Sequence, residues 1–528
     1  MARVCIASHH GSLAGLRADP EFAPERAGAA DAPPASALFE LRLDQYSDLS
    51  AANMAGAVQA LGPEHVVATF RRRDEGGGCA DATDETRLFY LGQAASLRVA
   101  YVDIELATIR SQRRAWQDLR AFRRDDRPQF VVSFHDFAGS PPLEQLRALR
   151  REAEEAGADV VKLAVTAQTI FDTEPLLDLL RERDWRRPLL ALAMSEAGFW
   201  TRVLGPLFPN PAPFTFARGT AAAGTAPGQP TWRELDRLYR FHELGPGTPV
   251  YGVIGRPIGH SLSPLMLNTA LAARRLPGVY LPFLVVGDPA RFVRGIAVKL
   301  GVRGLSVTIP HKEAVLAACA ERDALVRQIG AANTLVRRGT EAAPAWHATN
   351  TDASAAAGSL EAALGGAGSL RGRAVAILGA GGAAKAVAFG VKARGAEVLI
   401  WNRTAERARD LAANVGARSV SKEELLQADP QVAAVVNTTP VGMYPRVDES
   451  PLEEGELPGG SLIFDTVYNP MRTKLLQMAE ARGLKTLPGL EMFVGQGAAQ
   501  FELFTGCPAP REEMAAVVRA ELVRRASV

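Results

Sequence analysis

The feature that most constrains the fold of this chain is an alternation of apolar and helix-like segments along its first half. Eight apolar runs recur between residues 3 and 219. The stretches between them, such as LEQLRALRREAEEAGA (143–158), carry apolar residues at helical spacing. Eight strand–helix units in about 240 residues are typical of a (β/α)8 barrel. The predicted strands are residues 3–8, 37–44, 65–70, 98–106, 129–135, 159–166, 188–195 and 213–219.

A second α/β pattern follows the first after a short break. Residues 231–244 predict the closing helix of the barrel, and GPGTP (245–249) has the Gly/Pro content of a domain linker. New strands begin at VYGVIG (250–255), and RGRAVAILGAGG (371–382) opens another α/β unit. A helix at about 490–504 precedes a helical tail. We therefore expect an α/β protein in which a barrel precedes a two-lobed second half.

Composition excludes several classes of partner. The 528 residues carry a net charge of only +2, so neither nucleic acid nor an anionic membrane is expected as a partner. The four cysteines form no CxxC pair, which indicates a reduced compartment without a zinc site or disulfide framework. No apolar run approaches the ~20 residues of a membrane span. Met1 leads almost directly into a strand, which leaves no room for a targeting peptide, so we expect a cytoplasmic protein.

A lysine and a histidine occupy adjacent strands of the predicted barrel. His135 ends one strand, and Lys162 lies inside the apolar run of the next. Barrel enzymes carry out their chemistry at the C-terminal ends of the strands, so both side chains can face the same mouth. Loss of water contact lowers the pKa of a lysine and makes a neutral amine available to attack a ketone. The alternative is a structural lysine that pairs with a carboxylate.

Charged residues in neighbouring strands indicate what the barrel binds. Glu40, Arg42 and Asp44 stand at alternate positions of one strand and therefore share a face. A row of charges inside a barrel is costly unless a polar ligand or partner meets it. Further polar groups at the strand ends are Arg71, Glu75, Arg202, Thr225 and Gln229. Together they predict a ligand with a carboxylate and several hydroxyls.

The motifs ELRLD, TFR…EGG, SFHDF, VKLAV and APGQ occur in this order and resemble type I 3-dehydroquinate dehydratases over residues 1–244. The resemblance implies that Lys162 forms a Schiff base with the substrate ketone. His135 would then act as general base and acid, and Glu75 would orient it. The implied substrate-binding residues are Glu40, Arg42, Arg71, Arg202, Thr225 and Gln229. Thr225 stands where bacterial members commonly have serine, which keeps the hydroxyl.

The second half contains a dinucleotide-binding pattern. In AILGAGGAAKAV a strand leads through Gly379-x-Gly381-x-x-Ala384 into a helix, the context that phosphate binding requires. An NAD site has an acidic residue about 20 positions further on. Here that position carries Asn402, Arg403 and Thr404, with Arg407 one helical turn later. Two arginines and a hydroxyl suit a 2′-phosphate and predict NADP, although a surface arginine pair is the alternative.

Polar residues upstream of the glycine loop indicate a second substrate pocket. GRPIGHSLSP places Ser261 and Ser263 two positions apart, and SVTIPHK ends a strand with Thr308 and Lys312. GAANTL and TNTD add Asn333 and Asp352. A lysine and an aspartate from separate loops can pass a proton to a carbonyl that is being reduced. A structural salt bridge is the alternative.

With VVNTTPVGM, DTVYNP and GLEMFVGQGAAQFELFTG downstream, residues 249–528 resemble shikimate dehydrogenases. This resemblance implies hydride transfer from NADPH to 3-dehydroshikimate, with Lys312 and Asp352 as the proton-transfer pair. The implied substrate-binding residues are Ser261, Ser263, Thr308, Asn333, Tyr468 and Gln496. The implied cofactor-binding residues are Gly379, Ala380, Gly381, Gly382, Ala383, Asn402, Arg403, Thr404, Arg407, Thr466 and Gly489. Ser306 stands where many bacterial members have asparagine, and the serine form resembles the fused enzymes of plants.

The product of the first reaction is the substrate of the second, so the fusion resembles the bifunctional dehydroquinate dehydratase–shikimate dehydrogenases. We expect a barrel at 1–244, a linker at 245–249, a substrate lobe at 250–357, a Rossmann lobe at 358–488 and returning helices at 489–528. The chain is expected to act as a monomer or homodimer. Two alternatives are an NAD-dependent quinate dehydrogenase in the second half and a non-catalytic metabolite sensor. All the expected catalytic groups are present, which argues against the sensor.

Overall fold

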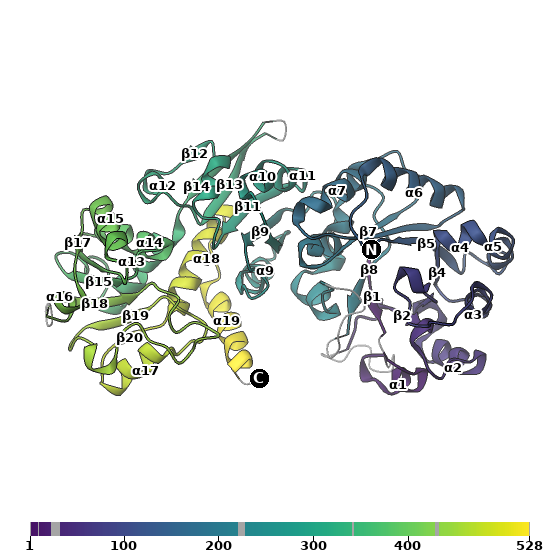
Figure 1. The fold of residues 1–528 in the computed structure, drawn as a ribbon, viewed down its shortest axis with the longest axis horizontal. Coiled ribbons are helices and arrows are strands. Elements are labelled where there is room, and N and C mark those ends of the chain that lie inside the picture. The colour runs from purple at the N-terminus through teal and green to yellow at the C-terminus, as the bar shows by residue number, and fades with distance from the viewer. Residues whose placement is uncertain are drawn as a thin grey trace. The chain divides into compact units, whose positions relative to one another are not determined.

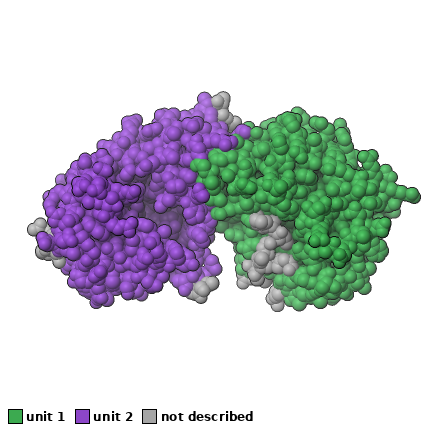
Figure 2. Space-filling view, viewed as in Figure 1, with its two compact units in different colours: residues 1–249, 281–287 green, residues 250–280, 288–528 purple. Residues whose placement is uncertain are grey.

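The computed structural model describes residues 2–8, 10–22, 32–219, 228–340, 343–427 and 432–526. Thr225 lies outside these ranges. The chain divides into two compact units, shown in different colours in Figure 2: residues 1–249 with 281–287, and residues 250–280 with 288–528. Within the described part of the chain, no helix is both long enough and apolar enough to cross a membrane.

Unit 1 contains the predicted barrel, which is confirmed. Its eight strands all pair in parallel, in the order β7-β6-β5-β4-β3-β2-β1-β8. A bridge between Leu189 and Pro211 brings β7 to the chain just before β8 and nearly closes the ring (Figure 1). The strands are β1 Arg3–Ala7, β2 Leu38–Arg42, β3 Val66–Thr69, β4 Tyr101–Glu105, β5 Gln129–His135, β6 Val160–Thr166, β7 Leu189–Met194 and β8 Phe214–Arg218. Each lies within a predicted segment.

Side chains inside the barrel are sorted into layers along the strands. One buried apolar cluster includes Cys5, Leu38, Val67, Tyr101, Val131, Val160, Leu190 and Phe214. Successive side chains of a strand alternate between its faces, so the residue two positions later faces the same way. Two positions after Leu38, Val67, Tyr101, Val131 and Val160, the same strands carry the polar residues Glu40, Thr69, Asp103, Ser133 and Lys162. The polar layer therefore lies towards the C-terminal ends of β2 to β6, where barrel enzymes place their chemistry.

The helices of unit 1 surround this ring of strands (Figure 1). The predicted helix at 143–158 is confirmed as α6, but the predicted closing helix at 231–244 is not one regular helix. It consists of a π-helical segment, Glu234–Leu238, and a 3-10 turn, Phe241–Glu243. Arg240 between them has a left-handed backbone (φ 48°), which interrupts the helix. The α-helices are α1 Leu13–Ala18, α2 Ala51–Leu61, α3 Asp84–Ser96, α4 Leu106–Ser111, α5 Arg113–Arg120, α6 Leu143–Glu155, α7 Glu174–Arg181 and α8 Phe199–Leu204.

The second half begins with a mixed six-stranded sheet of order β10-β9-β11-β13-β14-β12. β9 and β11 are parallel, whereas β13 runs antiparallel to both β11 and β14. The strands are β9 Val250–Gly255, β10 Val279–Leu284, β11 Val302–Val307, β12 Glu321–Arg322, β13 Thr334–Gly339 and β14 Pro344–Thr349. The helices of this lobe are α9 Ser263–Ala273, α10 Pro289–Arg294, α11 Ile296–Lys299 and α12 Ala324–Ile329.

The third sheet has the parallel order β17-β16-β15-β18-β19-β20 that a Rossmann lobe requires. Its strand order changes direction at β15, next to β18, which is where such sheets bind a dinucleotide. The strands are β15 Ala374–Leu378, β16 Glu397–Trp401, β17 Arg418–Ser419, β18 Val432–Asn437, β19 Leu462–Asp465 and β20 Thr486–Leu487. The helices are α14 Gly382–Ala393, α15 Ala405–Val415, α16 Lys422–Gln427 and α17 Lys474–Ala481.

Three longer helices join the two lobes of unit 2 (Figure 1). They are α13 Thr351–Leu364, α18 Gly489–Thr505 and α19 Arg511–Ala526. α18 packs against α13, α19 and α9, and it also contacts β11 and β13. Glycines in α18 permit close packing, since a Cβ at Gly497 would lie 2.1 Å from the Met266 side chain. α18 and α19, which follow the Rossmann strands, therefore return to the first lobe.

Candidate active sites

Lys162 lies buried in β6 between an anion and an aromatic ring. Its Nζ is 2.9 Å from Oδ2 of Asp103 and 4.3 Å from the centroid of the Phe216 ring. Ser133 is its cross-strand neighbour in β5. The amine therefore has a carboxylate partner. This pairing was the alternative interpretation of Lys162, a structural lysine paired with a carboxylate. The same position puts the amine in the polar layer of the barrel.

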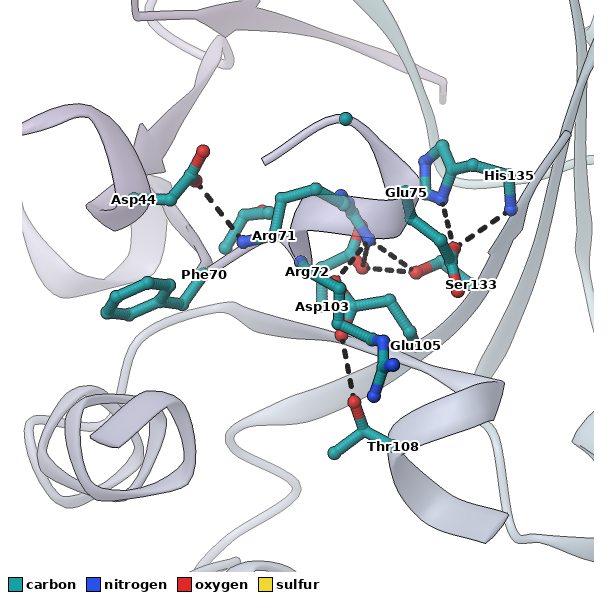
Figure 3. Close-up of polar contacts among 12 residues, drawn as sticks. Asp44, Phe70, Arg71, Arg72, Glu75, Asp103, Glu105, Thr108, Ser133 and His135 are labelled. Atoms are coloured by element: carbon teal, nitrogen blue, oxygen red, sulfur yellow. Dashed lines mark hydrogen bonds and ion pairs between the residues drawn. The ribbon is translucent and has the colours of Figure 1, made fainter. Parts of the chain in front are cut away.

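His135 ends β5 and is held by Glu75 from the loop after β3. Oε2 of Glu75 accepts the His135 backbone N–H at 3.0 Å and lies 2.9 Å from Nδ1 (Figure 3). Burial and the negative charge of Glu105 raise the pKa of Glu75 to about 8. Burial and the charges of Arg71 and Lys162 lower the pKa of His135 well below its ordinary value. His135 is therefore neutral near pH 7, with Nδ1 occupied and Nε2 left for proton transfer.

Behind these two groups lies a buried network around Arg71 (Figure 3). The Arg71 guanidinium donates to both Asp103 oxygens at 3.0 and 2.9 Å, to Glu105 at 3.0 Å and to Ser133 at 2.7 Å. Glu105 in turn pairs with Arg87 of α3. Burial opposes the charged form of Arg71, but Asp103 and Glu105 raise its pKa. Arg71 was expected to bind ligand, whereas here it organises the carboxylates of β4.

Asp103, Glu105 and Ser133 are site residues that the sequence reasoning missed. The signal was present, because Asp103 and Glu105 stand at alternate positions of β4 just as Glu40 and Arg42 do in β2. Both carboxylates have 0% exposure. A buried carboxylate of this kind needs partners, and their pattern therefore predicts cations on the adjacent strands.

The remaining predicted residues line the barrel mouth from β2 and β7. Glu40 accepts a hydrogen bond from Thr69, and Arg42 pairs through Nε and Nη2 with Asp44 at 3.0 and 2.8 Å. Gln229 is buried, and the adjacent Gly228 is fixed against β7, since a Cβ there would lie 2.2 Å from the Ser195 carbonyl oxygen. This contact places Gly228 against Ser195, the residue that follows β7.

Arg202 in α8 differs from the other buried cations of unit 1. It is only 2% exposed, and within the described ranges it has no ion-pair partner and its Nε has no hydrogen bond. Burial lowers the pKa of Arg202 to about 10, a value at which the guanidinium is still charged at pH 7. A buried, unpaired cation is costly, which indicates that its partner is an anionic ligand.

Unit 2 brings together the predicted proton-transfer pair. Lys312 follows β11 and Asp352 lies in the first turn of α13, and Lys312 Nζ is 2.7 Å from Oδ2 of Asp352. Asn333 fixes the start of α13, because its side chain donates to the Thr351 hydroxyl at 2.9 Å and accepts the Thr351 N–H at 2.8 Å. The position of Asp352 is therefore set by Asn333 and α13 together.

Hydroxyl and amide groups form a buried chain next to this pair. Tyr280 donates to Ser306 at 2.6 Å, Ser306 donates to Gln500 at 2.6 Å, and Gln500 donates to the Thr334 hydroxyl at 3.0 Å. Gln500 was not predicted, although it lies one helical turn after the predicted Gln496.

The structure also places the remaining predicted substrate residues of unit 2. The Ser263 N–H contacts the Ser261 hydroxyl at 3.3 Å. Elsewhere, Gln496 donates to the Phe493 carbonyl at 2.9 Å, and Tyr468 stacks on Phe493. Thr308 is half-buried after β11.

The glycine loop after β15 fits a pyrophosphate. Gly379 has φ +120°, and a Cβ there would meet the Thr438 hydroxyl at 2.6 Å, so only glycine fits this turn. A Cβ at Gly381 would meet no described atom within 4 Å, which leaves space before the N-terminus of α14. Ala380 belongs to the same loop, whereas Gly382 and Ala383 begin α14. The residues present therefore suit a dinucleotide phosphate at a helix N-terminus.

Arg403, Thr404 and Arg407 are exposed beyond the end of β16, and Asn402 shapes this turn by donating to the Thr404 carbonyl at 2.9 Å. Within the described ranges neither arginine has an ion pair. Thr466 follows β19, and its carbonyl would lie 2.5 Å from a Cβ at Gly489, the first residue of α18. The predicted cofactor residues thus surround the C-terminal ends of β15, β16 and β19.

The two units define a barrel with a buried lysine and a Rossmann-type oxidoreductase in one chain. Family models match in the same order: type I 3-dehydroquinase at 25–246, shikimate dehydrogenase substrate binding domain at 253–335, shikimate / quinate 5-dehydrogenase at 361–454 and shikimate 5′-dehydrogenase C-terminal domain at 489–519. The chain is 36% identical over 488 residues to the bifunctional 3-dehydroquinate dehydratase/shikimate dehydrogenase, chloroplastic, of Arabidopsis thaliana, covering 90% of this chain and 78% of that one. It therefore belongs to the family of bifunctional 3-dehydroquinate dehydratase/shikimate dehydrogenases.

Other matches cover the second half alone. The shikimate dehydrogenase (NADP(+)) of Methanosarcina acetivorans is 42% identical over 277 residues, which is 50% of this chain and 95% of that one. The solved structure of shikimate 5-dehydrogenase from Thermus thermophilus in complex with NADP(H) and shikimate is 36% identical, with a TM-score of 0.46, and covers 51% of this chain and 98% of that one.

Proposed function

We propose that Lys162, His135 and Glu75 dehydrate 3-dehydroquinate to 3-dehydroshikimate in unit 1, and that Lys312 and Asp352 serve its reduction to shikimate with NADPH in unit 2. The observation that carries the proposal is the placement of Lys162 and His135 on neighbouring strands at one barrel mouth, with His135 held by Glu75. The family of the chain supports the reaction pair.

In unit 1, the Lys162 amine adds to the substrate ketone, and loss of water with uptake of one proton produces an iminium. The positive nitrogen withdraws electrons from the adjacent carbon, and neutral His135 removes a proton from that carbon. The resulting enamine expels the hydroxyl group at the next carbon, and the imidazolium of His135 returns its proton so that water departs. Hydrolysis of the conjugated iminium then releases 3-dehydroshikimate and restores the Lys162 amine.

Arg202 supplies the main substrate contact in this scheme. Its buried guanidinium has no ion partner in the described chain, and a substrate carboxylate provides one. Glu40, Arg42, Arg71, Thr225 and Gln229 are proposed to contact the carboxylate and hydroxyls. Arg71 acts at least in part through Asp103, to which it is already bound.

In unit 2, bound NADPH supplies the hydride that reduces the ketone of 3-dehydroshikimate. The Lys312–Asp352 pair supplies a proton to the carbonyl oxygen, since the lysine donates and the aspartate holds it in place. Ser261, Ser263, Thr308, Asn333, Tyr468 and Gln496 are proposed to hold the substrate hydroxyls and carboxylate. Arg403, Thr404 and Arg407 suit the 2′-phosphate, which favours NADP over the NAD-dependent quinate alternative.

The domain boundaries are proposed as a barrel at 1–244, a linker at 245–249, a substrate lobe at 250–357, a Rossmann lobe at 358–488 and returning helices at 489–528. The four free cysteines, Cys5, Cys79, Cys319 and Cys507, support a reducing compartment, and we place both reactions in the cytoplasm. The Arabidopsis relative is named as chloroplastic. The near-neutral chain is proposed to act as a monomer or homodimer, without nucleic acid or membrane partners.

Reciprocal variants test the assignment. Lys162→Ala is expected to lower dehydration by more than about 1,000-fold while NADPH-dependent reduction of 3-dehydroshikimate persists. Lys312→Ala is expected to lower reduction by about 100- to 10,000-fold while dehydration persists. Each variant is the folding control for the other, because both activities are measured on the same full chain. Retention of dehydration in Lys162→Ala would exclude the Schiff-base assignment.

A further inference from the structure

The charged layer around Lys162 contains a carboxylate that the proposed reaction does not yet use. Asp103 accepts hydrogen bonds from Lys162 at 2.9 Å, from Ser133 at 2.6 Å and from two Arg71 nitrogens at 3.0 and 2.9 Å. It has no exposed surface. Burial alone would raise its pKa, but the charges of Arg71 and Lys162 hold the pKa of Asp103 well below its ordinary range. Asp103 is therefore a fixed negative charge in contact with the reacting nitrogen.

The position of Asp103 is also fixed by Arg71, which donates to both carboxylate oxygens. Arg71 is itself held by Glu105 (Figure 3). Glu105 also pairs with Arg87. Charges thus alternate from Arg87 through Glu105, Arg71 and Asp103 to Lys162. An ion pair built in this way cannot turn away from the nitrogen when a ligand binds, because every oxygen of Asp103 already has a partner.

Schiff-base formation creates a need for a hydrogen-bond acceptor beside the Lys162 nitrogen. When a lysine ammonium and a ketone combine to an iminium and water, the nitrogen keeps its positive charge but its N–H groups fall from three to one. That remaining N–H needs an acceptor, and Oδ2 of Asp103 lies at hydrogen-bond distance from Nζ. The aromatic face of Phe216 offers no such acceptor, although it favours a positive charge above it.

We propose that Asp103 is a further catalytic residue, the counter-ion that keeps the Lys162 Schiff base protonated and directs its single N–H. This rests on the proposed dehydration. A neutral imine withdraws electrons far less than an iminium, so loss of that proton removes the driving force for proton abstraction by His135. A fixed opposite charge within about 4–6 Å favours the charged form by about one to three pKa units. Other ionisable groups facing this site are Cys5, Glu40, Arg71, Glu75, Glu105 and His135.

The test is the pH profile of kcat for dehydration in the full chain carrying Asp103→Asn. At alkaline pH the variant loses the iminium proton more readily, so its alkaline limb is expected about one to three pH units below that of the wild type. Glu105→Gln is the matched control, because Glu105 is equally buried and shares Arg71 but does not touch Lys162. It is expected to lower the rate without moving the alkaline limb.

Reduction of 3-dehydroshikimate by the same chain reports whether unit 2 remains intact in every variant. An alkaline limb that stays in place in Asp103→Asn, or that moves equally in Glu105→Gln, overturns the inference. If Asp103→Asn fails to fold, Ser133→Ala decides, because it removes one hydrogen bond from Asp103 and is expected to shift the limb in the same direction by less. Absence of dehydration in the wild type would instead remove the proposed function itself.

Discussion

Two buried arginines of unit 1, Arg71 and Arg202, differ in whether their charge is already paired within the protein. Arg71 lies among two carboxylates and a serine, and its pKa is raised. Arg202 is as deeply buried, but it has no such partner in the described chain, and burial lowers its pKa to about 10. Only Arg202 therefore has a positive charge that a bound substrate can neutralise. At the scale of single residues, the main substrate contact is therefore expected at Arg202, whereas Arg71 is expected to act mainly through the carboxylates that it holds.

Arg202→Met keeps the volume of the side chain and removes its charge. We expect the KM for 3-dehydroquinate to rise about 10- to 100-fold, since a hydrogen bond to a charged group contributes about 1.5–3 kcal/mol. The thermal unfolding midpoint of the ligand-free protein should not fall, because an unpaired buried charge is lost. In the control Arg71→Met the midpoint should fall, because Asp103 and Glu105 lose their partner. An unchanged KM in Arg202→Met would contradict the assignment.

The lowered pKa of His135 predicts the acid side of the dehydration profile. His135 must be neutral to accept a proton, and burial with the charges of Arg71 and Lys162 disfavours its protonation. Activity is therefore lost as pH falls through the lowered pKa, and the acid limb of kcat should lie below the ordinary histidine value of about 6.5. The measurement is kcat at saturating 3-dehydroquinate from pH 5 to 8. An acid limb of kcat at or above about pH 6.5 would contradict the lowered pKa of His135.

At the scale of elements, the strands of the barrel could be predicted because each is a short apolar run between helical segments. Lys162 and His135 could also be singled out as candidates, since they interrupt or end such runs, whereas the role of Glu75, which lies beyond the end of β3, is implied by the resemblance alone. Asp103 and Glu105 were harder to recognise as site residues. The sequence shows two acidic residues in an apolar strand, and only the structure shows that Arg71 and Lys162 pair with them. The helix predicted at 231–244 failed for a local reason, the left-handed backbone of Arg240.

The loop between β15 and α14 allows a paired test on two glycines. Gly379→Ala should destabilise unit 2, because its φ of +120° and the 2.6 Å approach to Thr438 exclude a side chain. Gly381→Ala should leave folding unchanged but raise the KM for NADPH, because its methyl group would fill space that we assign to the pyrophosphate. Thermal unfolding and NADPH titrations distinguish the two. Dehydration in unit 1 is the internal control, and an unchanged KM in Gly381→Ala would contradict the phosphate site.

At the scale of the whole molecule, each unit contains the groups that we propose for one reaction, and the two proposed reactions share an intermediate. The order of the units could be predicted from the linker GPGTP and the new strand pattern after it, because both are local features of the sequence. The two C-terminal helices could be predicted from the sequence pattern, whereas only the packing of α18 shows that Gln500, Ser306 and Tyr280 meet.

The central claim is that one chain converts 3-dehydroquinate to shikimate. It is tested most directly by supplying the purified full chain with 3-dehydroquinate and NADPH alone. We expect shikimate to appear with loss of one NADPH for each molecule formed, and we expect Lys162→Ala to lose this conversion while still reducing added 3-dehydroshikimate. Consumption of NADPH with 3-dehydroshikimate but not with 3-dehydroquinate, by a wild-type chain that is folded, would contradict the account.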